Sequence, residues 1–149
     1  MMGGVALPRG RTISDALVAG AVGAVLSGVP STAWAVGTGR SVTEGVLAAG
    51  SLVLPGKWPA PVLVAAAVPV HLALSLSWAV VLAATVPQRK AVLWATLGGA
   101  AIAALDLGVI GRRFPRIRAL HQPSQIADHL AYGAAVGATL RLRERPRHV

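Results

Sequence analysis

The sequence predicts an all-α fold, an integral membrane helical bundle of about four transmembrane helices with one short interfacial helix. The stretch from Trp58 to Gln88 contains no Asp, Glu, Lys or Arg. A bilayer core of about 30 Å is crossed by roughly 20 such residues, whereas a soluble helix of this length needs a polar face. The whole chain is 54% hydrophobic and only 13% charged. A single membrane domain over residues 1–149 fits this composition.

The spans follow from the gaps between charged residues. The expected spans are residues 13–36, 60–86, 91–110 and 124–140. Trp34 and Trp58 are placed as interface anchors of the first two. The third contains one charged residue, Asp106, and the fourth is near the lower limit of length for crossing. Pro123 favours a helix start there, and the basic tail 141–149 favours a stop.

The apolar segment 46–54 is too short to cross, so an interfacial or re-entrant helix is expected. With four spans and the N-terminus inside, eight basic residues flank the inner side: Arg9, Arg11, Arg89, Lys90, Arg141, Arg143, Arg145 and Arg147. Six flank the outer side: Arg40, Lys57, Arg112, Arg113, Arg116 and Arg118. The positive-inside rule therefore places both termini in the cytoplasm and the protein in the cell membrane. A fifth span over residues 46–54 is the alternative, and it divides the basic residues equally.

The N-terminal segment has a second interpretation. Arg9 and Arg11, an apolar stretch over residues 16–29, a breaker at Pro30 and the run Ala33–Ala35 imitate a secretory signal peptide with its cleavage site. Trp34 inside that run is equally well placed as an interface anchor. Both interpretations stay open at this point.

The charge balance points to lipid. A formal net charge of +9 would indicate nucleic acid in a soluble protein. Here the basic residues stand at the ends of apolar segments, where they meet anionic lipid head groups, so no nucleic-acid partner is expected. The expected partners are the bilayer with its anionic head groups, and another membrane protein or a second copy of the chain. The chain has no cysteine, which excludes disulfides and thiolate chemistry.

Small residues at four-residue spacing predict helix contacts, because membrane helices pack where backbones can approach closely. Gly20, Ala24 and Gly28 form one such stripe, and Gly133 and Gly137 form a GxxxG motif in the fourth span. The second stripe is expected to pack within the bundle or against a second copy.

Ionisable residues inside the spans are the candidate functional groups, because a charge in the bilayer is costly. Asp106 and Asp128 are expected about 6 Å inside one interface, judged from a rise of about 1.5 Å per residue, and His129 lies one residue deeper. The loop above them adds Arg112, Arg113, Arg116 and Arg118. An ion-pair clamp between the last two helices is one interpretation; a proton, ion or lipid-phosphate site is the other. Asp106 should reach Arg112, Arg113 or His129, whereas Asp15 should stay hydrated at its helix start.

His71 is expected near the middle of the second span, bonded as a neutral ring to a nearby carbonyl. The four histidines form no H-x-x-x-H pair, so no metal site is expected. The sequence holds no P-loop and no dinucleotide fingerprint, and we predict no cofactor and no catalytic residue.

Three segments carry a resemblance: residues 28–32, 105–120 and 125–133. Together they resemble a group of small multi-pass membrane proteins from GC-rich bacteria. The resemblance implies a short helical membrane protein and brings no activity, substrate or catalytic residue. Function is thus expected to be non-enzymatic, as an accessory or structural membrane subunit. The alternatives are a small transporter or channel using His71 and Asp106, or a lipid-directed enzyme at the outer interface with Asp106, Asp128 or His129 as acid or base.

Overall fold

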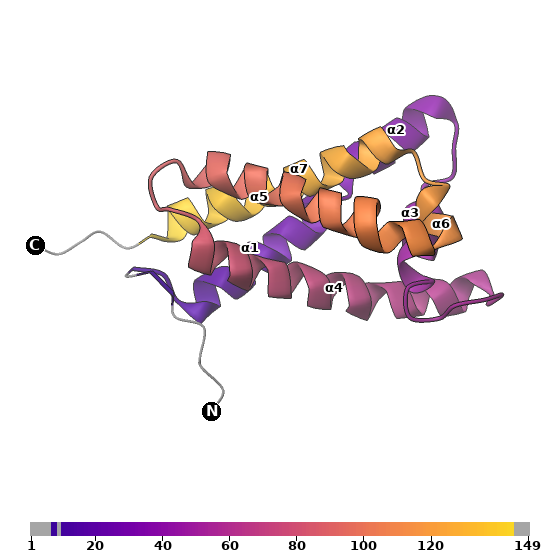
Figure 1. The fold of residues 1–149 in the computed structure, drawn as a ribbon, viewed down its shortest axis with the longest axis horizontal. Coiled ribbons are helices and arrows are strands. Elements are labelled where there is room, and N and C mark those ends of the chain that lie inside the picture. The colour runs from indigo at the N-terminus through magenta and orange to yellow at the C-terminus, as the bar shows by residue number, and fades with distance from the viewer. Residues whose placement is uncertain (1–6, 9, 145–149) are drawn as a thin grey trace, which may run out of the picture.

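The computed structural model describes residues 7, 8 and 10–144, and these form helices joined by short loops (Figure 1). The helices are α1 (Ile13–Leu26), α2 (Val29–Thr38), α3 (Glu44–Gly50), α4 (Ala60–Thr85), α5 (Ala91–Leu105), the π-helix η1 (Asp106–Ile110), the 3₁₀-helix η2 (Gly111–Arg113), α6 (Pro115–Arg118) and α7 (Gln122–Arg143). Arg9 and the tail 145–149, which enter the predicted charge balance, lie outside the described residues.

Three helical stretches are long and apolar enough to cross a membrane: Ile13–Thr38, Ala60–Thr85 and Ala91–Arg113. They agree with the first three predicted spans. The predicted fourth span is a helix as well. This helix, α7, is more polar and is not among those apolar enough to cross a membrane. It has 22 residues, and at about 1.5 Å per residue it is long enough for a bilayer core.

The first stretch is broken, whereas a continuous helix over residues 13–36 was predicted. Ser27 and Gly28 form a turn between α1 and α2. Pro30 has no N–H to donate to the carbonyl four residues earlier, so the regular ladder cannot run through this point. Pro30 instead occupies the first turn of α2, where a missing donor costs nothing. The two halves therefore leave helix ends in the middle of the apolar stretch.

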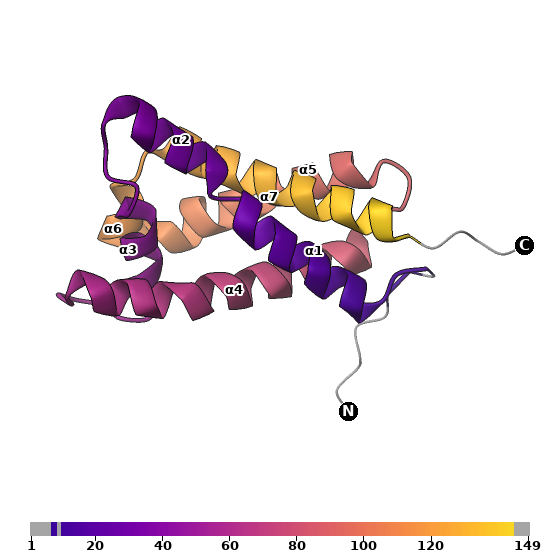
Figure 2. The ribbon, with the colours of Figure 1, turned by 180° about the vertical axis from the view of Figure 1, so that it is seen from behind.

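Four long rods make up the molecule: α1 with α2, then α4, α5 and α7 (Figures 1 and 2). α7 contacts α1, α2 and α5, and α1 contacts α4. The short helices α3 and α6 lie at the end where α4 and α7 begin, and the start of α1 and the end of α7 lie at the opposite end (Figure 2). The chain thus passes along the rods in alternating directions.

Close contact between α5 and α7 depends on glycine. A Cβ on Gly137 would lie 2.7 Å from Val92 Cα, and one on Gly133 would lie 3.0 Å from Thr96 Cα. Gly99 faces back toward the His129 backbone in the same way. The GxxxG motif therefore packs within the chain, as one of the two predicted alternatives had it.

Of the stripe predicted on the first span, Gly20 packs against a neighbouring helix of the chain, whereas Gly28 has no such contact. Gly20 faces Ala79 and Leu76 of α4, and Ala24 is partly buried. Gly28 is exposed with open space around it, because the helix breaks there. Gly23, which the prediction omitted, packs against the Tyr132 ring and Val136 of α7.

The apolar surface of the rods mostly faces outward. Only 17% of the residues in the most apolar 18-residue segment of α4 are buried. Val68, Leu72 and Leu74 are among its exposed large side chains. The interior is built mainly of alanine, with Leu63, Val136 and Leu140 as its largest fully buried side chains. A fold that buries small residues and exposes large apolar ones matches a lipid environment.

The predicted interfacial segment 46–54 corresponds to α3 and the turn after it. α3 has seven residues and is about 10 Å long. It packs on the beginning of α4, where Gly50 meets the Leu63 backbone. The helix is too short to cross a bilayer, and its contacts hold it at one end of the rods.

Candidate functional site

Polar side chains gather where α1 gives way to α2. The Asp128 carboxylate on α7 accepts a hydrogen bond from the Ser31 backbone N–H at 2.8 Å. Ser31 belongs to the first turn of α2, whose N–H groups have no partner within the helix. A carboxylate at this end is also favoured by the helix dipole. Asp128 therefore caps the second half of the broken helix from a neighbouring helix.

His71 on α4 holds the other side of the break. Its Nε2 lies 3.0 Å from the carbonyl oxygen of Ala24, which also accepts the Ser27 hydroxyl at 3.2 Å. A carbonyl can only accept, so His71 Nε2 carries a proton and donates it. The predicted bond from His71 to a nearby carbonyl is thus present, and it joins α4 to the last turn of α1. The imidazole remains exposed on the outside of the protein.

Asp106 and His129 meet as the helical rise predicted. His129 Nε2 lies 3.4 Å from Asp106 Oδ2, and Nδ1 lies 2.8 Å from the Gln125 carbonyl oxygen. Because Nδ1 must donate to that carbonyl, a proton between Nε2 and the carboxylate is held by one group or the other. The two side chains are 22% and 29% exposed. The pair fastens the end of α5 to α7.

The backbone changes at Asp106, where the π-helix η1 begins. π-type turns are rare and are often found at functional positions. The wider turn ends at Gly111, where a Cβ would lie 2.7 Å from both the Asp106 carbonyl oxygen and an Ile117 methyl group. This turn leads the chain from α5 into the basic loop.

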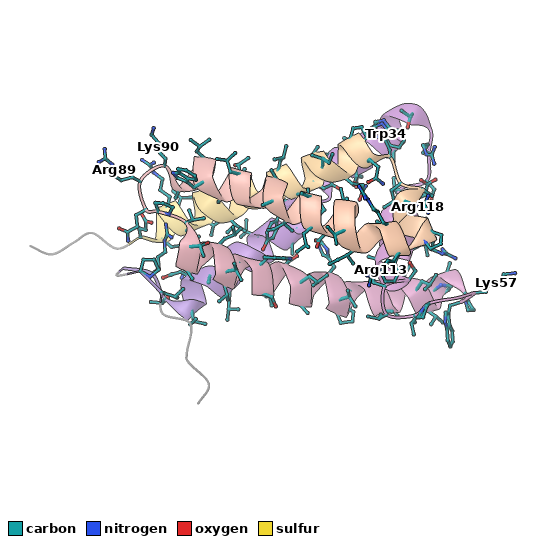
Figure 3. The ribbon with its side chains drawn as sticks, in the orientation of Figure 1. Trp34, Lys57, Arg89, Lys90, Arg113 and Arg118 are labelled. Atoms are coloured by element: carbon teal, nitrogen blue, oxygen red, sulfur yellow. The ribbon has the colours of Figure 1, made fainter. Side chains whose placement is uncertain are left out.

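The predicted arginines do not reach the two aspartates. Arg112, Arg113, Arg116 and Arg118 are exposed on η2 and α6. Among the described residues, no ion pair joins them to Asp106 or Asp128. They point outward because η2 and α6 run along the end of the rods, and Figure 3 shows Arg113 and Arg118 there. The predicted cluster thus divides into a His–Asp pair, a capping aspartate and a separate basic surface.

An aromatic stack lies beside this end. The Trp34 and His121 rings are parallel, with centroids 4.0 Å apart, and the Arg40 guanidinium lies 5.4 Å from the Trp34 ring. The stack ties α2 to the residue before α7. The stack of Trp34 on His121 was not predicted, because a partner 87 positions later in the chain leaves no local sequence signal.

A second charged network lies at the opposite end and was missed by sequence reasoning. Arg11 is 6% exposed and donates to the carbonyls of Ala83 at 3.1 Å and Val86 at 2.6 Å. It also forms an ion pair with Glu144 at 2.8 Å. These bonds tie the segment before α1 to the ends of α4 and α7.

Asp15 belongs to the same network, and the prediction that it stays hydrated is wrong. Asp15 is 5% exposed. It forms a capping box with Thr12 and accepts a hydrogen bond from Arg143 at 2.8 Å. The helix start that was expected to face water is covered by the end of α7.

Tyr132 adds a further link between helices. Its hydroxyl donates to the carbonyl of Ser75 on α4, and its ring packs on Gly23. Among the described residues, no three His, Asp or Glu side chains are grouped to hold a metal ion. The polar contacts of this site are therefore mostly bonds between one helix and another.

Comparison of the chain with protein-family models, curated proteins and solved structures gave no match.

Proposed function

We propose that the protein is a four-span integral membrane protein with a non-enzymatic role, as an accessory or structural subunit of the membrane. One observation carries this proposal: three ionisable side chains of the long helices each bond to another helical element. His71 joins α4 to α1, Asp128 joins α7 to α2, and His129 joins α7 to the end of α5. Polar bonds of this kind stabilise helix association in lipid.

The fourth crossing is supported by α7. It has the length of a span, and it lies against α1 and α5. Tyr132, Asp128 and His129 all have partners on neighbouring elements. A helix with its polar groups satisfied inside the protein can cross a bilayer at a lower mean hydropathy than a lone span.

A surface for a partner helix is present on the outer face of the break. Val25, Gly28, Val29, Thr32 and Ala33 line a shallow hollow of about 360 Å³. Gly28 and Ala33 leave the backbone open, which lets a second transmembrane helix approach closely. The GxxxG face of α7 is already filled by α5, so this hollow is the better candidate for an external contact.

Tagged purification in mild detergent tests the subunit role, with bound proteins identified and quantified. We expect a partner protein to co-purify in a fixed ratio to this protein. The Ala33→Leu variant should lose that partner, because the larger side chain fills the hollow. Ala65→Leu is the matched control, since Ala65 is an exposed alanine on α4 outside the hollow. A partner retained by Ala33→Leu, or no partner at a fixed ratio, would contradict the proposal.

A proton-conducting transporter is the second candidate, favoured by the His129–Asp106 pair. A proton held between an imidazole and a carboxylate can be passed to either group. Liposomes containing the purified protein should then show proton flux that His129→Gln and Asp106→Asn each abolish. Flux equal to that of empty liposomes would exclude this role.

A further inference from the structure

The turn between α4 and α5 and the last turn of α7 enclose a hollow at the end of the molecule where the described chain begins and ends. It has a volume of about 730 Å³ and is lined by Gln88, Arg89, Lys90, Arg141 and Glu144. Figure 3 shows Arg89 and Lys90 extending from this turn, at the opposite end from Arg113 and Arg118. Two separate elements thus bring basic side chains to one place.

Within the part of the chain that the structure describes, the positive charge of this hollow is not neutralised. Its one carboxylate, Glu144, receives two hydrogen bonds from the buried Arg11, at 3.2 and 2.8 Å. Arg89, Lys90 and Arg141 form no ion pair among the described residues. Arg11 therefore compensates Glu144, and three cations are left facing the hollow.

The backbone around the hollow adds no competing negative charge. The carbonyls of Ala83 and Val86 at the end of α4, which would present a negative helix terminus, are bonded by Arg11. Lys90 has a left-handed backbone with φ of 58°, and α5 begins at the next residue. The hollow thus lies beside the positive end of α5 while the negative end of α4 is covered.

The hollow lies beside the ends of two apolar stretches, and this position indicates the kind of ligand. The turn joins two of the apolar stretches that are long enough to cross a membrane. Leu93 and Trp94, in the first turn of α5, are 52% and 48% exposed. A Trp next to basic residues at the end of a span is typical of the boundary between acyl chains and head groups. An anion at this depth lies where phospholipid phosphates lie.

We propose that this hollow binds the head-group phosphate of an anionic phospholipid, with Arg89, Lys90 and Arg141 as the ligands of the phosphate. Two arginines and a lysine from two elements provide charge-assisted hydrogen bonds to one phosphate. The acyl chains would lie along the exposed apolar surface of α5. The proposal depends on membrane insertion but not on the subunit role.

Thermal unfolding of the full chain in mild detergent tests the site. Phosphatidylglycerol, phosphatidylcholine with the same acyl chains, and inorganic phosphate are each titrated. We expect a saturable rise in Tm with phosphatidylglycerol only. The double variant Arg89→Gln/Arg141→Gln should weaken the apparent affinity at least tenfold, and Lys90→Gln should weaken it by a smaller factor. The control Arg112→Gln/Arg113→Gln removes the same charge from the opposite end and should leave the affinity within twofold.

Equal weakening in the control would show general charge attraction and overturn the site. An equal response to phosphatidylcholine would remove the role of charge, and saturation by inorganic phosphate alone would assign the hollow to a free anion. Carbonate extraction of native membranes distinguishes failure of the lipid site from failure of membrane insertion. Release of the protein into the supernatant would reject the membrane proposal itself. Retention in the membrane without selectivity for anionic lipid would reject only the head-group site.

Discussion

At the scale of single residues, Asp15 is more buried and more fully bonded than Asp106, although the sequence predicted a hydrated Asp15. Asp15 is 5% exposed and is bonded by Thr12 and Arg143, whereas Asp106 has an exposed side chain fraction of 29% and one contact at 3.4 Å. Sequence position alone placed Asp15 at a wet helix start and Asp106 inside a span. The covering of Asp15 by α7 is a tertiary contact between residues 128 positions apart.

Asp15→Leu should therefore destabilise the protein more than Asp106→Leu. The first substitution removes a capping box, worth about 1 kcal/mol, and leaves the Arg143 guanidinium without its partner. Thermal unfolding of both variants in the same detergent measures the difference. A lower Tm for Asp106→Leu would show that the His129–Asp106 pair contributes more than the capping network.

Arg11 is a buried cation at the end of the molecule where α1 begins and α7 ends. Arg11→Met should lower the free energy of unfolding by about 3 to 5 kcal/mol, because it leaves Glu144 and two carbonyls of α4 unsatisfied. Arg11→Lys should also destabilise, since an ammonium cannot reproduce the geometry of a guanidinium that binds a carboxylate on one side and carbonyls on the other.

Glu144→Gln is the matched comparison for Arg11→Met. It should lower the free energy of unfolding by less, because an amide oxygen can still accept a hydrogen bond from Arg11. Denaturation in detergent is the measurement. Equal losses for Arg11→Met and Glu144→Gln would mean that the ion pair, and not the bonds to Ala83 and Val86, carries the stabilisation.

At the scale of elements, the gaps between charges predicted α4 and the α5–η2 stretch well, because an uncharged run long enough to cross is a local property of sequence. The break between α1 and α2 was not predicted, although Pro30 was visible. A proline two residues after Gly28 is compatible with a kinked helix as well as with two helices. The structure has two helices, and the cap on α2 comes from Asp128, which lies 97 positions beyond Ser31.

Gly133 and Gly137 should be the least tolerant positions of α7. Replacing both by Leu pushes α5 away from α7, since the added side chains would meet the backbone of Ala91, Val92, Ala95 and Thr96. We expect loss of the folded state in detergent, with no dependence on protein concentration, because the contact is within one chain. Ala134→Leu is the control on the same helix, at a partly buried position.

A concentration-dependent loss in the Gly133→Leu/Gly137→Leu variant would instead place this face between two copies. Unchanged thermal stability would mean that α5 and α7 do not pack through these glycines. Either result would contradict the arrangement in which α7 lies between α1 and α5.

At the scale of the whole molecule, the candidate site was only partly foreseeable. The depth of Asp106 and His129 followed from helical rise, a property of the element, and the structure brings them together. The partners of Asp128, Arg11 and Asp15 depend on which helices are neighbours, and one sequence does not contain that information. The arginines of the loop at residues 111–121 were assigned to the aspartates by depth, but the direction of η2 and α6 turns them outward.

The alternating rods give a topology that labelling can test directly, because the chain has no cysteine of its own. Single cysteines at the exposed positions Ser41, Arg89, Arg116 and Leu142 report the two ends of the rods. With four spans and cytoplasmic termini, Ser41→Cys and Arg116→Cys should react with a membrane-impermeant maleimide in intact cells. Arg89→Cys and Leu142→Cys should react only after permeabilisation, since positive residues favour the inner side.

The pair Ser41 and Arg116 separates this topology from the five-span alternative. With α3 at the end of the rods, both positions lie on one side of the membrane; if α3 crossed, they would lie on opposite sides. A seven-residue helix of about 10 Å cannot span a core of about 30 Å, so we expect the two to label alike. Labelling of Arg116→Cys only after permeabilisation, with Ser41→Cys labelled in intact cells, would contradict the four-span arrangement. Labelling of all four positions on the reverse sides would keep the four spans and invert the orientation.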